Sequence, residues 1–149
     1  MRSLKDEDLK SIFSLKANIE MVFFKAYIMN SSMPKPLNFT HAKTLIHLFF
    51  RGAMSMSDIS RHLNLEKGSF TPVANILIKM GYVSKIHSSE DRRIYNLELT
   101  EKGYEFAKAY TTDHVNFVKE KLTLLSDEEK EAYFGAIYTL IELTEKLKD

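Results

Sequence analysis

Apolar residues recur every three or four positions through most of the chain, and this spacing predicts a mainly helical protein. The first helix is predicted over residues 6–30. Its repeating apolar positions are Leu9, Ile12, Phe13, Ile19, Val22, Phe23, Ala26 and Tyr27. The proline-containing stretch SSMPKP at 31–36 ends this helix and forms a linker. A second helix is expected through Phe50, with Thr40 as its N-cap.

The middle of the chain shows the order of a helix-turn-helix. A short helix is predicted at 57–63, a turn at Asn64 and Leu65, and a fourth helix at 66–80. Gly81 follows at the C′ position, where glycine ends helices because it tolerates a left-handed backbone.

A β-hairpin and two further helices complete the pattern. Residues 82–86 and 94–99 are expected to be extended, and the polar loop between them makes a long hairpin tip. Thr100 is expected to cap a fifth helix. The last helix begins with a capping box, in which Ser126 is the N-cap and Glu129 occupies N3.

These elements define a mainly α fold with a small β-hairpin wing, a winged helix-turn-helix flanked by long N- and C-terminal helices. The predicted divisions are an N-terminal dimerisation helix and linker at 1–36, a winged helix-turn-helix domain at 37–103, and C-terminal dimerisation helices at 104–149. A small domain cannot easily cover the apolar stripes of its first and last helices from its own chain, and we therefore expect a homodimer. A monomeric helical cap is the alternative.

The amino-acid composition and motif content exclude several classes of function. The 149 residues include no cysteine, which excludes disulfides, thiolate metal sites and thiol redox sensing. No signal peptide or membrane-spanning segment is recognisable, and we expect a cytoplasmic protein with no membrane partner. The chain shows no Ser-His-Asp order with supporting glycines and no phosphate-binding loop, so no catalytic residue is assigned and no enzyme is expected.

Charge is distributed unevenly, although the net charge is only +1. Six basic and three acidic residues between Arg61 and Arg93 give a local balance of +3, whereas residues 126–149 carry −4. This polarity would orient the molecule on a polyanion.

The fourth helix has two contrasting faces at 100° per residue. Phe70, Val73, Ala74 and Leu77 lie on one side, and Gly68, Thr71, Pro72, Asn75 and Lys79 lie opposite. The second face is small and able to form hydrogen bonds, which suits close approach to base edges in a DNA major groove. A helix face that is merely solvated would also be polar.

The hairpin tip carries a cationic triplet, Asp91-Arg92-Arg93. A cationic loop beside the fourth helix can enter a minor groove, whose negative potential favours arginine. Asp91 is expected to support the wing by holding the Arg93 guanidinium through a charge-assisted hydrogen bond.

SDISRHLNLEKGSFTPVANILIKMGYVSK, followed by EDRRIYNLELTEKG, resembles the multiple antibiotic resistance regulator (MarR) family of bacterial transcription factors. The matching features are Gly81 closing the recognition helix, Asp91-x-Arg93 in the wing, and Leu99-Thr100-x-x-Gly103 leading into the next helix. The resemblance implies a dimeric regulator, expected to act as a repressor, that binds a pseudo-palindromic operator of double-stranded DNA. It places the fourth helix in the major groove and Arg93, or Arg92, in the minor groove.

One departure from the family pattern affects the site. Pro72 stands where the recognition helix often carries a basic residue, and proline disfavours a helical Thr71. Either the helix begins late, with Ser69 as N-cap, or it bends at Pro72, and Asn75 is the stronger candidate for base contact. The residues assigned to DNA contact are Ser57, Arg61, Lys67, Ser69, Thr71, Pro72, Asn75, Lys79, Arg92 and Arg93.

The resemblance also implies release from DNA by a small aromatic or phenolic effector. The aromatic candidates for such a pocket are Phe13, Phe23, Phe24, Phe49 and Phe50, with core packing as the alternative role. Lys16, His41 and His47 could hold an acidic ligand, but their spacing assigns no ligand-binding residue. The histidines form no metal-binding pair, and no metal or cofactor is expected. The remaining functional alternative is a winged-helix module that binds protein instead of DNA.

Overall fold

The computed structural model describes residues 3–66 and 68–148. The chain divides into two compact units, Met1–His114 and Val115–Asp149. This division follows packing within the chain and does not test the functional boundaries predicted after residues 36 and 103, which stay predictions. None of the helices in the described residues has the length and hydrophobicity that a membrane span requires.

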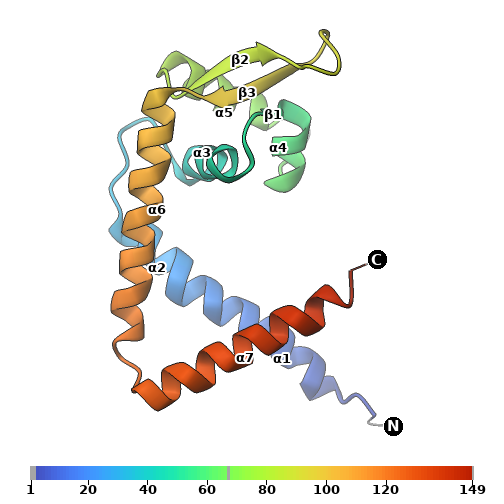
Figure 1. The fold of residues 1–149 in the computed structure, drawn as a ribbon, viewed down its shortest axis with the longest axis vertical. Coiled ribbons are helices and arrows are strands. Elements are labelled where there is room, and N and C mark those ends of the chain that lie inside the picture. The colour runs from blue at the N-terminus through green and yellow to red at the C-terminus, as the bar shows by residue number, and fades with distance from the viewer. Residues whose placement is uncertain (1–2, 67, 149) are drawn as a thin grey trace. The chain divides into compact units, whose positions relative to one another are not determined.

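The N-terminal helical segment has the predicted extent but not a uniform geometry. It consists of α1 (Asp6–Ile19), a π-helical turn η1 (Glu20–Lys25) and α2 (Ala26–Asn30), which follow one another without a break (Figure 1). The prediction of a helix over 6–30 is confirmed. The spacing of apolar residues did not predict the π turn, because one wider turn barely changes a pattern in which apolar residues recur every three or four positions.

Helix α3 (Phe39–Arg51) begins earlier than predicted, because Asn38 is its N-cap. The Asn38 Oδ1 atom accepts hydrogen bonds from the backbone N–H groups of Thr40 and His41, at 3.0 and 3.3 Å. The His41 Nδ1 atom accepts in return from the Asn38 N–H at 3.0 Å. The expectation that Thr40 caps this helix is therefore wrong, because the reciprocal pair satisfies the first-turn donors from a position two residues earlier.

The wing belongs to a three-stranded antiparallel sheet. Strands β2 (Val83–His87) and β3 (Tyr95–Leu99) form the predicted hairpin, with Val83 opposite Leu99. A two-residue strand, β1 (Met54–Ser55), pairs with the other edge of β3, which gives the order β1-β3-β2. Two residues are too few to show a period of two, and β1 was therefore not predicted.

Helices α4 (Met56–His62) and α5 (Phe70–Lys79) form the helix-turn-helix. The predicted start of the second of these at residue 66 is wrong, and the alternative of a late start after Ser69 is confirmed. Pro72 is then the third residue of α5, within the first turn, where backbone N–H groups have no partner inside the helix. A proline at this place therefore removes no helical hydrogen bond.

Gly81 ends α5 as predicted, with a φ of +76°. The N–H of Tyr82 donates to the Leu77 carbonyl at 2.9 Å, and the N–H of Gly81 donates to the Ile78 carbonyl at 3.0 Å. This pair of bonds is the Schellman arrangement, which turns the chain from α5 directly into β2.

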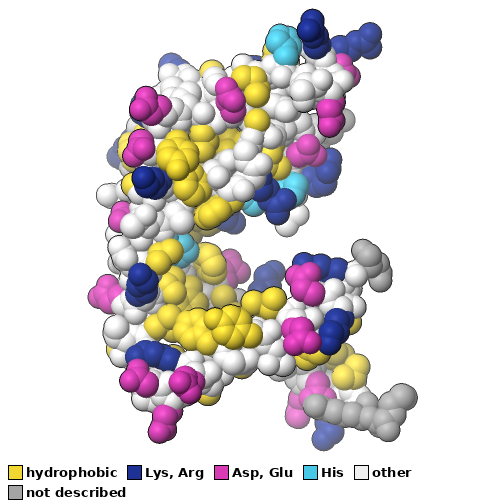
Figure 2. Space-filling model, viewed as in Figure 1, with side chains coloured by type: hydrophobic (Ala, Val, Ile, Leu, Met, Phe, Trp, Pro, Cys, Tyr) yellow, Lys and Arg dark blue, Asp and Glu magenta, His cyan; other side chains and the backbone are white. Residues whose placement is uncertain are grey.

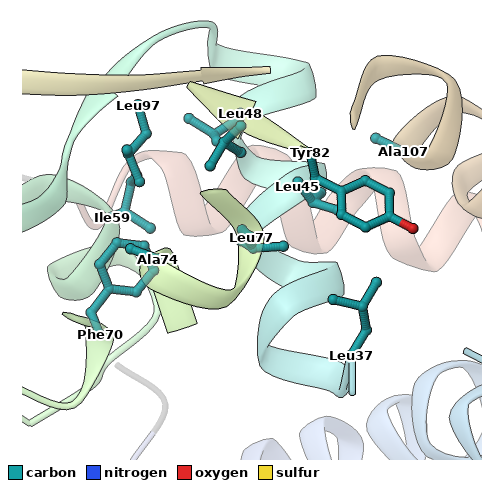
Figure 3. Close-up of a cluster of buried hydrophobic side chains, with 11 residues drawn as sticks. Leu37, Leu45, Leu48, Ile59, Phe70, Ala74, Leu77, Tyr82, Leu97 and Ala107 are labelled. Carbon is teal, nitrogen blue, oxygen red and sulfur yellow. The ribbon is translucent and has the colours of Figure 1, made fainter. Parts of the chain in front are cut away.

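One apolar core lies between α3, α4, α5 and the sheet (Figure 3). Leu45, Ile59, Ala74, Leu77 and Leu97 have no exposed surface, and Phe70 is 2% exposed. These side chains come from four different elements, so they fix the position of α5 relative to the rest of its unit.

The start of α6 (Glu101–Leu122) is tied to the end of α5 by one side chain. The Thr100 Oγ1 atom accepts from the N–H of Gly103 at 3.1 Å, which confirms the predicted cap. The same hydroxyl donates to the Gly81 carbonyl at 2.6 Å. The beginning of α6 and the turn that follows α5 therefore share one hydrogen-bonding group.

Helix α7 (Asp127–Glu145) belongs to the second unit and begins with the predicted capping box. The Ser126 N–H donates to a Glu129 carboxylate oxygen at 2.8 Å, and the Glu129 N–H donates to Ser126 Oγ at 3.2 Å. Apolar side chains gather along α7 in Figure 2, and none of its residues is buried.

Candidate nucleic-acid interface and ligand pocket

The two faces predicted for the recognition helix are present in α5. Phe70, Ala74 and Leu77 are buried in the core. Four polar or small residues of the opposite face are exposed: Thr71, Pro72, Asn75 and Lys79. The core therefore holds α5 by one side and leaves the other side open to a partner, although exposure alone does not identify that partner.

Helix α4 brings further predicted contact residues to the same surface. The Ser55 Oγ atom accepts from the Asp58 N–H at 3.1 Å and so caps this helix. The exposed Arg61 forms a surface ion pair with Asp58 at 3.1 Å. Together with residues of α5 and of the connecting turn, α4 lines a surface hollow. Its lining is Met56, Ser57, Ser60, Arg61, Leu65, Gly68, Phe70 and Thr71.

The turn between α4 and α5 completes this part of the site. Ser69 is exposed immediately before α5. Gly68 has a φ of +86°, a backbone conformation that favours glycine. Lys67, which the sequence also assigns to DNA contact, lies outside the described residues. The hollow thus unites Ser57, Arg61 and Thr71, three of the predicted contact residues, from two helices.

The tip of the wing is held by its backbone and exposes both arginines. Arg92 and Arg93 are exposed, and basic side chains project at the tip of the β2–β3 hairpin in Figure 2. The Asp91 Oδ1 atom accepts from the backbone N–H of Arg93 at 2.9 Å, and the Asp91 carbonyl accepts from the N–H of Ile94 at 2.9 Å.

Asp91 therefore supports the wing in a different way from the one predicted. Its carboxylate bonds the main chain of Arg93, and no ion pair in the described part of the chain joins the Arg93 guanidinium to an acid. An aspartate readily bonds the backbone two residues on, because its side chain mimics a turn of the main chain. The guanidinium stays available for an external partner.

His87 is a wing residue that the sequence did not reveal. Its Nδ1 atom lies 3.0 Å from the Arg92 carbonyl oxygen and donates to it. Its ring lies against Tyr95, the residue paired with it in the sheet, with centroids 4.6 Å apart. These two contacts hold the base of the loop to β2, five residues before Arg92. No local pattern predicts a contact across such a loop.

A pocket of about 290 Å³ lies within the first unit, between the α1–α2 segment and the helices of the winged domain. Its apolar lining includes Phe24, Ile28, Phe39 and Ile46, and its polar lining includes Lys43 and His47. The remaining lining residues are Tyr27, His62, Leu63, Asn64, Tyr110 and His114. Of the predicted effector candidates, Phe24 and His47 line this pocket, whereas Phe13, Lys16, Phe23, His41, Phe49 and Phe50 do not.

His114 of α6 forms one wall of the pocket and connects it to the π-helical turn. Its Nε2 atom donates to the Phe23 carbonyl at 2.7 Å. Its ring stacks on Tyr27 with centroids 4.5 Å apart. The Tyr27 hydroxyl donates to the Tyr110 carbonyl at 3.3 Å, and burial, with smaller effects of Tyr110 and Asp113, raises the pKa of Tyr27 to about 12. Tyr27 is therefore neutral at physiological pH.

His47 presents a polar atom that is not satisfied within the described structure. Its Nε2 atom is buried and has no hydrogen-bond partner there. Its ring lies 5.5 Å from that of His62, edge to face. Burial lowers the pKa of His47, and the neighbouring His62, Arg51 and Lys43 lower it further. Within the described residues, no group of three or more His, Asp or Glu side chains is arranged to hold a metal ion.

Comparison with known proteins assigns the chain to a class and a family. Residues 37–95 match the sequence profile of the MarR family. The chain is 32% identical over 121 residues to YfiV of Bacillus subtilis, an HTH-type transcriptional regulator of uncharacterised role. That match covers 80% of this chain and 71% of YfiV. This chain is also 27% identical over 96 residues to the HTH-type transcriptional repressor YetL of the same organism. That match covers 64% of this chain and 58% of YetL.

Solved structures show the same fold. FabT of Streptococcus pneumoniae, crystallised in complex with DNA, superimposes with a TM-score of 0.65 at 26% identity and covers 96% of each chain. A MarR family protein from Bacillus stearothermophilus gives a TM-score of 0.73 at 16% identity, covering 95% of this chain and 99% of its own.

The fold and the exposed face of α5 define a winged helix-turn-helix protein. The chain belongs to the MarR family, whose relatives named above are transcriptional regulators. It is accordingly a DNA-binding transcriptional regulator and not an enzyme, which confirms the family resemblance and the fold class read from the sequence.

Proposed function

We propose that the chain is a dimeric repressor that binds a pseudo-palindromic operator, with α5 in the major groove and a wing arginine in the adjacent minor groove. The observation that carries this proposal is the exposed polar face of α5 on a helix whose other face is locked in the core. Exposed Arg92 and Arg93 on the same unit supply a second, cationic contact. FabT, a relative of the same fold, has been crystallised with DNA, which supports this reading.

Uncovered apolar surface supports the homodimer. In α1, Ile12 is 63% exposed and Phe13 is 73% exposed. In α7, Tyr138 is 68% exposed and Ile141 is 54% exposed. Large apolar side chains are costly to leave in water, so these faces are suited to burial against a second copy. Two recognition helices related by a two-fold axis would then face two half-sites.

A gel-shift titration with operator DNA tests the DNA-binding part of the proposal. The protein should bind with an affinity that falls steeply as salt rises, because arginine and lysine displace counterions from phosphates. Arg93→Ala and Arg92→Ala should each weaken binding and reduce the salt slope by about one. Lys108→Ala, which removes an exposed lysine of α6 away from the wing, should leave both unchanged. Absence of any salt-sensitive shift at micromolar protein would contradict the proposal.

We further propose that the 290 Å³ pocket receives a small aromatic or phenolic effector that releases the repressor. Phe24, Phe39 and Ile46 would contact the ring, and Lys43 would face its polar group. The pocket is lined jointly by α2, α3 and α6, so a ligand there could change how these helices pack.

The effector proposal is tested with a phenolic acid such as 4-hydroxybenzoate as the probe. Binding should raise the melting temperature of the free protein and weaken its complex with DNA. Ile46→Trp should fill the pocket and remove both effects while DNA binding remains. The substitution Ser32→Ala in the linker leaves the pocket lining intact and should retain the response. A phenolic acid that acts equally on the Ile46→Trp protein would show that it binds elsewhere.

The alternative of a protein-binding winged-helix module rested on the near-neutral net charge. No observation in the described structure favours it over DNA binding, and the relatives are named as transcriptional regulators.

A further inference from the structure

We infer that the operator half-site presents A·T pairs to the first two turns of α5, with an adenine facing Asn75 and a thymine methyl group facing Thr71 and Pro72. This inference rests on the proposed binding of α5 in the major groove and adds the base composition that α5 selects. It follows from the side chains exposed on α5, and from those that this face lacks.

The exposed residues of α5 are spaced for neighbouring base pairs. Thr71 and Asn75 lie one helical turn apart, which corresponds to a rise of about 6 Å. Base pairs in B-DNA follow one another every 3.4 Å or so along each strand. Thr71 and Asn75 can therefore reach base pairs that are adjacent or separated by one step. Pro72, three residues before Asn75, lies on the same face.

Asn75 has a free amide that matches adenine. No hydrogen bond within the described residues engages its side chain, and the residue is exposed. A carboxamide offers one acceptor and one donor side by side. In the major groove this pair fits adenine, which presents the N6 amino group and the N7 acceptor together.

Thr71 and Pro72 offer an apolar contact surface at positions where an arginine or lysine would recognise guanine. Thr71 and Pro72 are both exposed in the first turn of α5. Threonine methyl groups and other small apolar groups pack on the C5-methyl group of thymine. Pro72 also has a fixed φ and no backbone donor, so its surface is rigid and carries no polar group of its own.

The same face lacks the residues that read G·C pairs. Guanine is read mainly by arginine or lysine, and the cytosine amino group by aspartate or glutamate. From Phe70 to Ile78 α5 contains none of these four residue types. Lys79, its one charged residue, is in the last turn, whereas the N-terminal residues of a recognition helix approach the bases.

Selection of binding sites from random double-stranded DNA by the full-length protein is the first test. We expect enriched half-sites to contain adjacent or nearly adjacent A·T pairs at their centre. Enrichment of G·C pairs at that place would overturn the inference while leaving the proposed DNA binding intact. Failure to enrich any sequence, with no salt-sensitive binding, would overturn the proposed function and this inference together.

Atomic substitution in the selected site identifies the contacts themselves. Replacing the central adenine by 7-deazaadenine should weaken binding about tenfold, since the acceptor for the Asn75 amide N–H is lost while the N6 amino group remains. Asn75→Ala should lose a similar factor on the natural site and should then be insensitive to 7-deazaadenine. An Asn75→Ala protein that still discriminates against 7-deazaadenine would overturn the assignment of Asn75.

A matched pair of variants tests the thymine contact. Replacing the central thymine by uracil removes only the C5-methyl group and should weaken binding by the wild type. Thr71→Ser loses the side-chain methyl and should discriminate less between thymine and uracil, whereas Thr71→Val keeps a methyl and should discriminate as the wild type does. Equal discrimination by all three proteins would overturn the role of Thr71. Circular dichroism should show that these exposed substitutions leave the fold unchanged.

Discussion

Gly103, in the first turn of α6, lies directly against the backbone carbonyl of Tyr82, the residue immediately before β2. A Cβ atom at Gly103 would lie 3.0 Å from the Tyr82 carbonyl carbon and closer still to its oxygen, and 3.1 Å from Leu99 Cδ2. The Thr100 N–H donates to the same Tyr82 carbonyl at 3.1 Å. The glycine of the Leu-Thr-x-x-Gly motif therefore allows α6 to pack on the strand that leaves the recognition helix.

We predict that Gly103→Ala destabilises the protein by about 1–3 kcal/mol or more, because the added methyl group overlaps backbone atoms that cannot rotate away. Urea denaturation followed by circular dichroism measures the change. Gly135→Ala is the matched control, since it also replaces a glycine within a helix but has open space around the new atom. It should be neutral or stabilising by up to about 1 kcal/mol. Equal effects of the two substitutions would show that the Tyr82 contact is not the cause.

Two substitutions at Asp91 separate its hydrogen bond from its charge. Asparagine retains an Oδ1 acceptor for the N–H of Arg93, whereas alanine does not. We expect Asp91→Ala to weaken DNA binding through a less ordered wing. Asp91→Asn should bind at least as well as the wild type, because it also removes a negative charge from beside the DNA. Gel shifts at two salt concentrations measure both. If asparagine were as harmful as alanine, the negative charge itself would be required.

Stability should fall on mild acidification because of His47. Its pKa in the folded protein lies below the ordinary value of 6.5. As pH falls through this ordinary value, His47 is protonated to a greater extent in the unfolded chain than in the folded protein. The free energy of unfolding therefore decreases as pH falls. Thermal unfolding between pH 7.5 and 5.5 should show this decrease, and His47→Gln should reduce it.

A second buried histidine, His41, also contributes to the pH dependence of stability. Burial also lowers the pKa of His41, so the pH dependence should shrink in His47→Gln without vanishing. A substitution that removes no titratable group, Ser32→Ala in the exposed linker, should leave the dependence as it is. A His47→Gln protein with the full dependence of the wild type would contradict the assignment to His47.

The hydrogen bond from His114 to the Phe23 carbonyl should stabilise the packing of α6 on the π-helical turn. His114→Phe keeps an aromatic ring against Tyr27 but loses the donor, and it should lower the free energy of unfolding by about 1 kcal/mol. His114→Gln keeps an N–H donor and should lose less through this bond. Denaturant titrations of both variants give the comparison. If the phenylalanine variant were as stable as the wild type, the bond would contribute little.

Local sequence signals were sufficient for most of the elements. The helix at 6–30, the Gly81 terminus of α5, the Thr100 cap and the Ser126 capping box depend on residues within one or two turns of each other. The same holds for the two faces of α5, because helical periodicity alone assigns Phe70 and Asn75 to opposite sides.

Other features depended on partners distant in the chain. The two-residue strand β1 exists because β3 offers it hydrogen bonds. The Asp91 bond is local by contrast, but two acceptable donors of Arg93 competed for it, and the carboxylate bonds the backbone N–H and not the guanidinium. The start of α5 was decided by competition between an early helix and a turn through Gly68, and Pro72 favours the later start.

The sequence by itself determined that this protein is a winged helix-turn-helix with an exposed polar recognition helix and a cationic wing, because periodicity, caps and turn residues act over short distances. Only the tertiary structure decided which side chains line the pocket. It joins His47, Tyr27 and His114 from three separate helices, and packing between segments far apart in the chain leaves no periodic trace in the sequence.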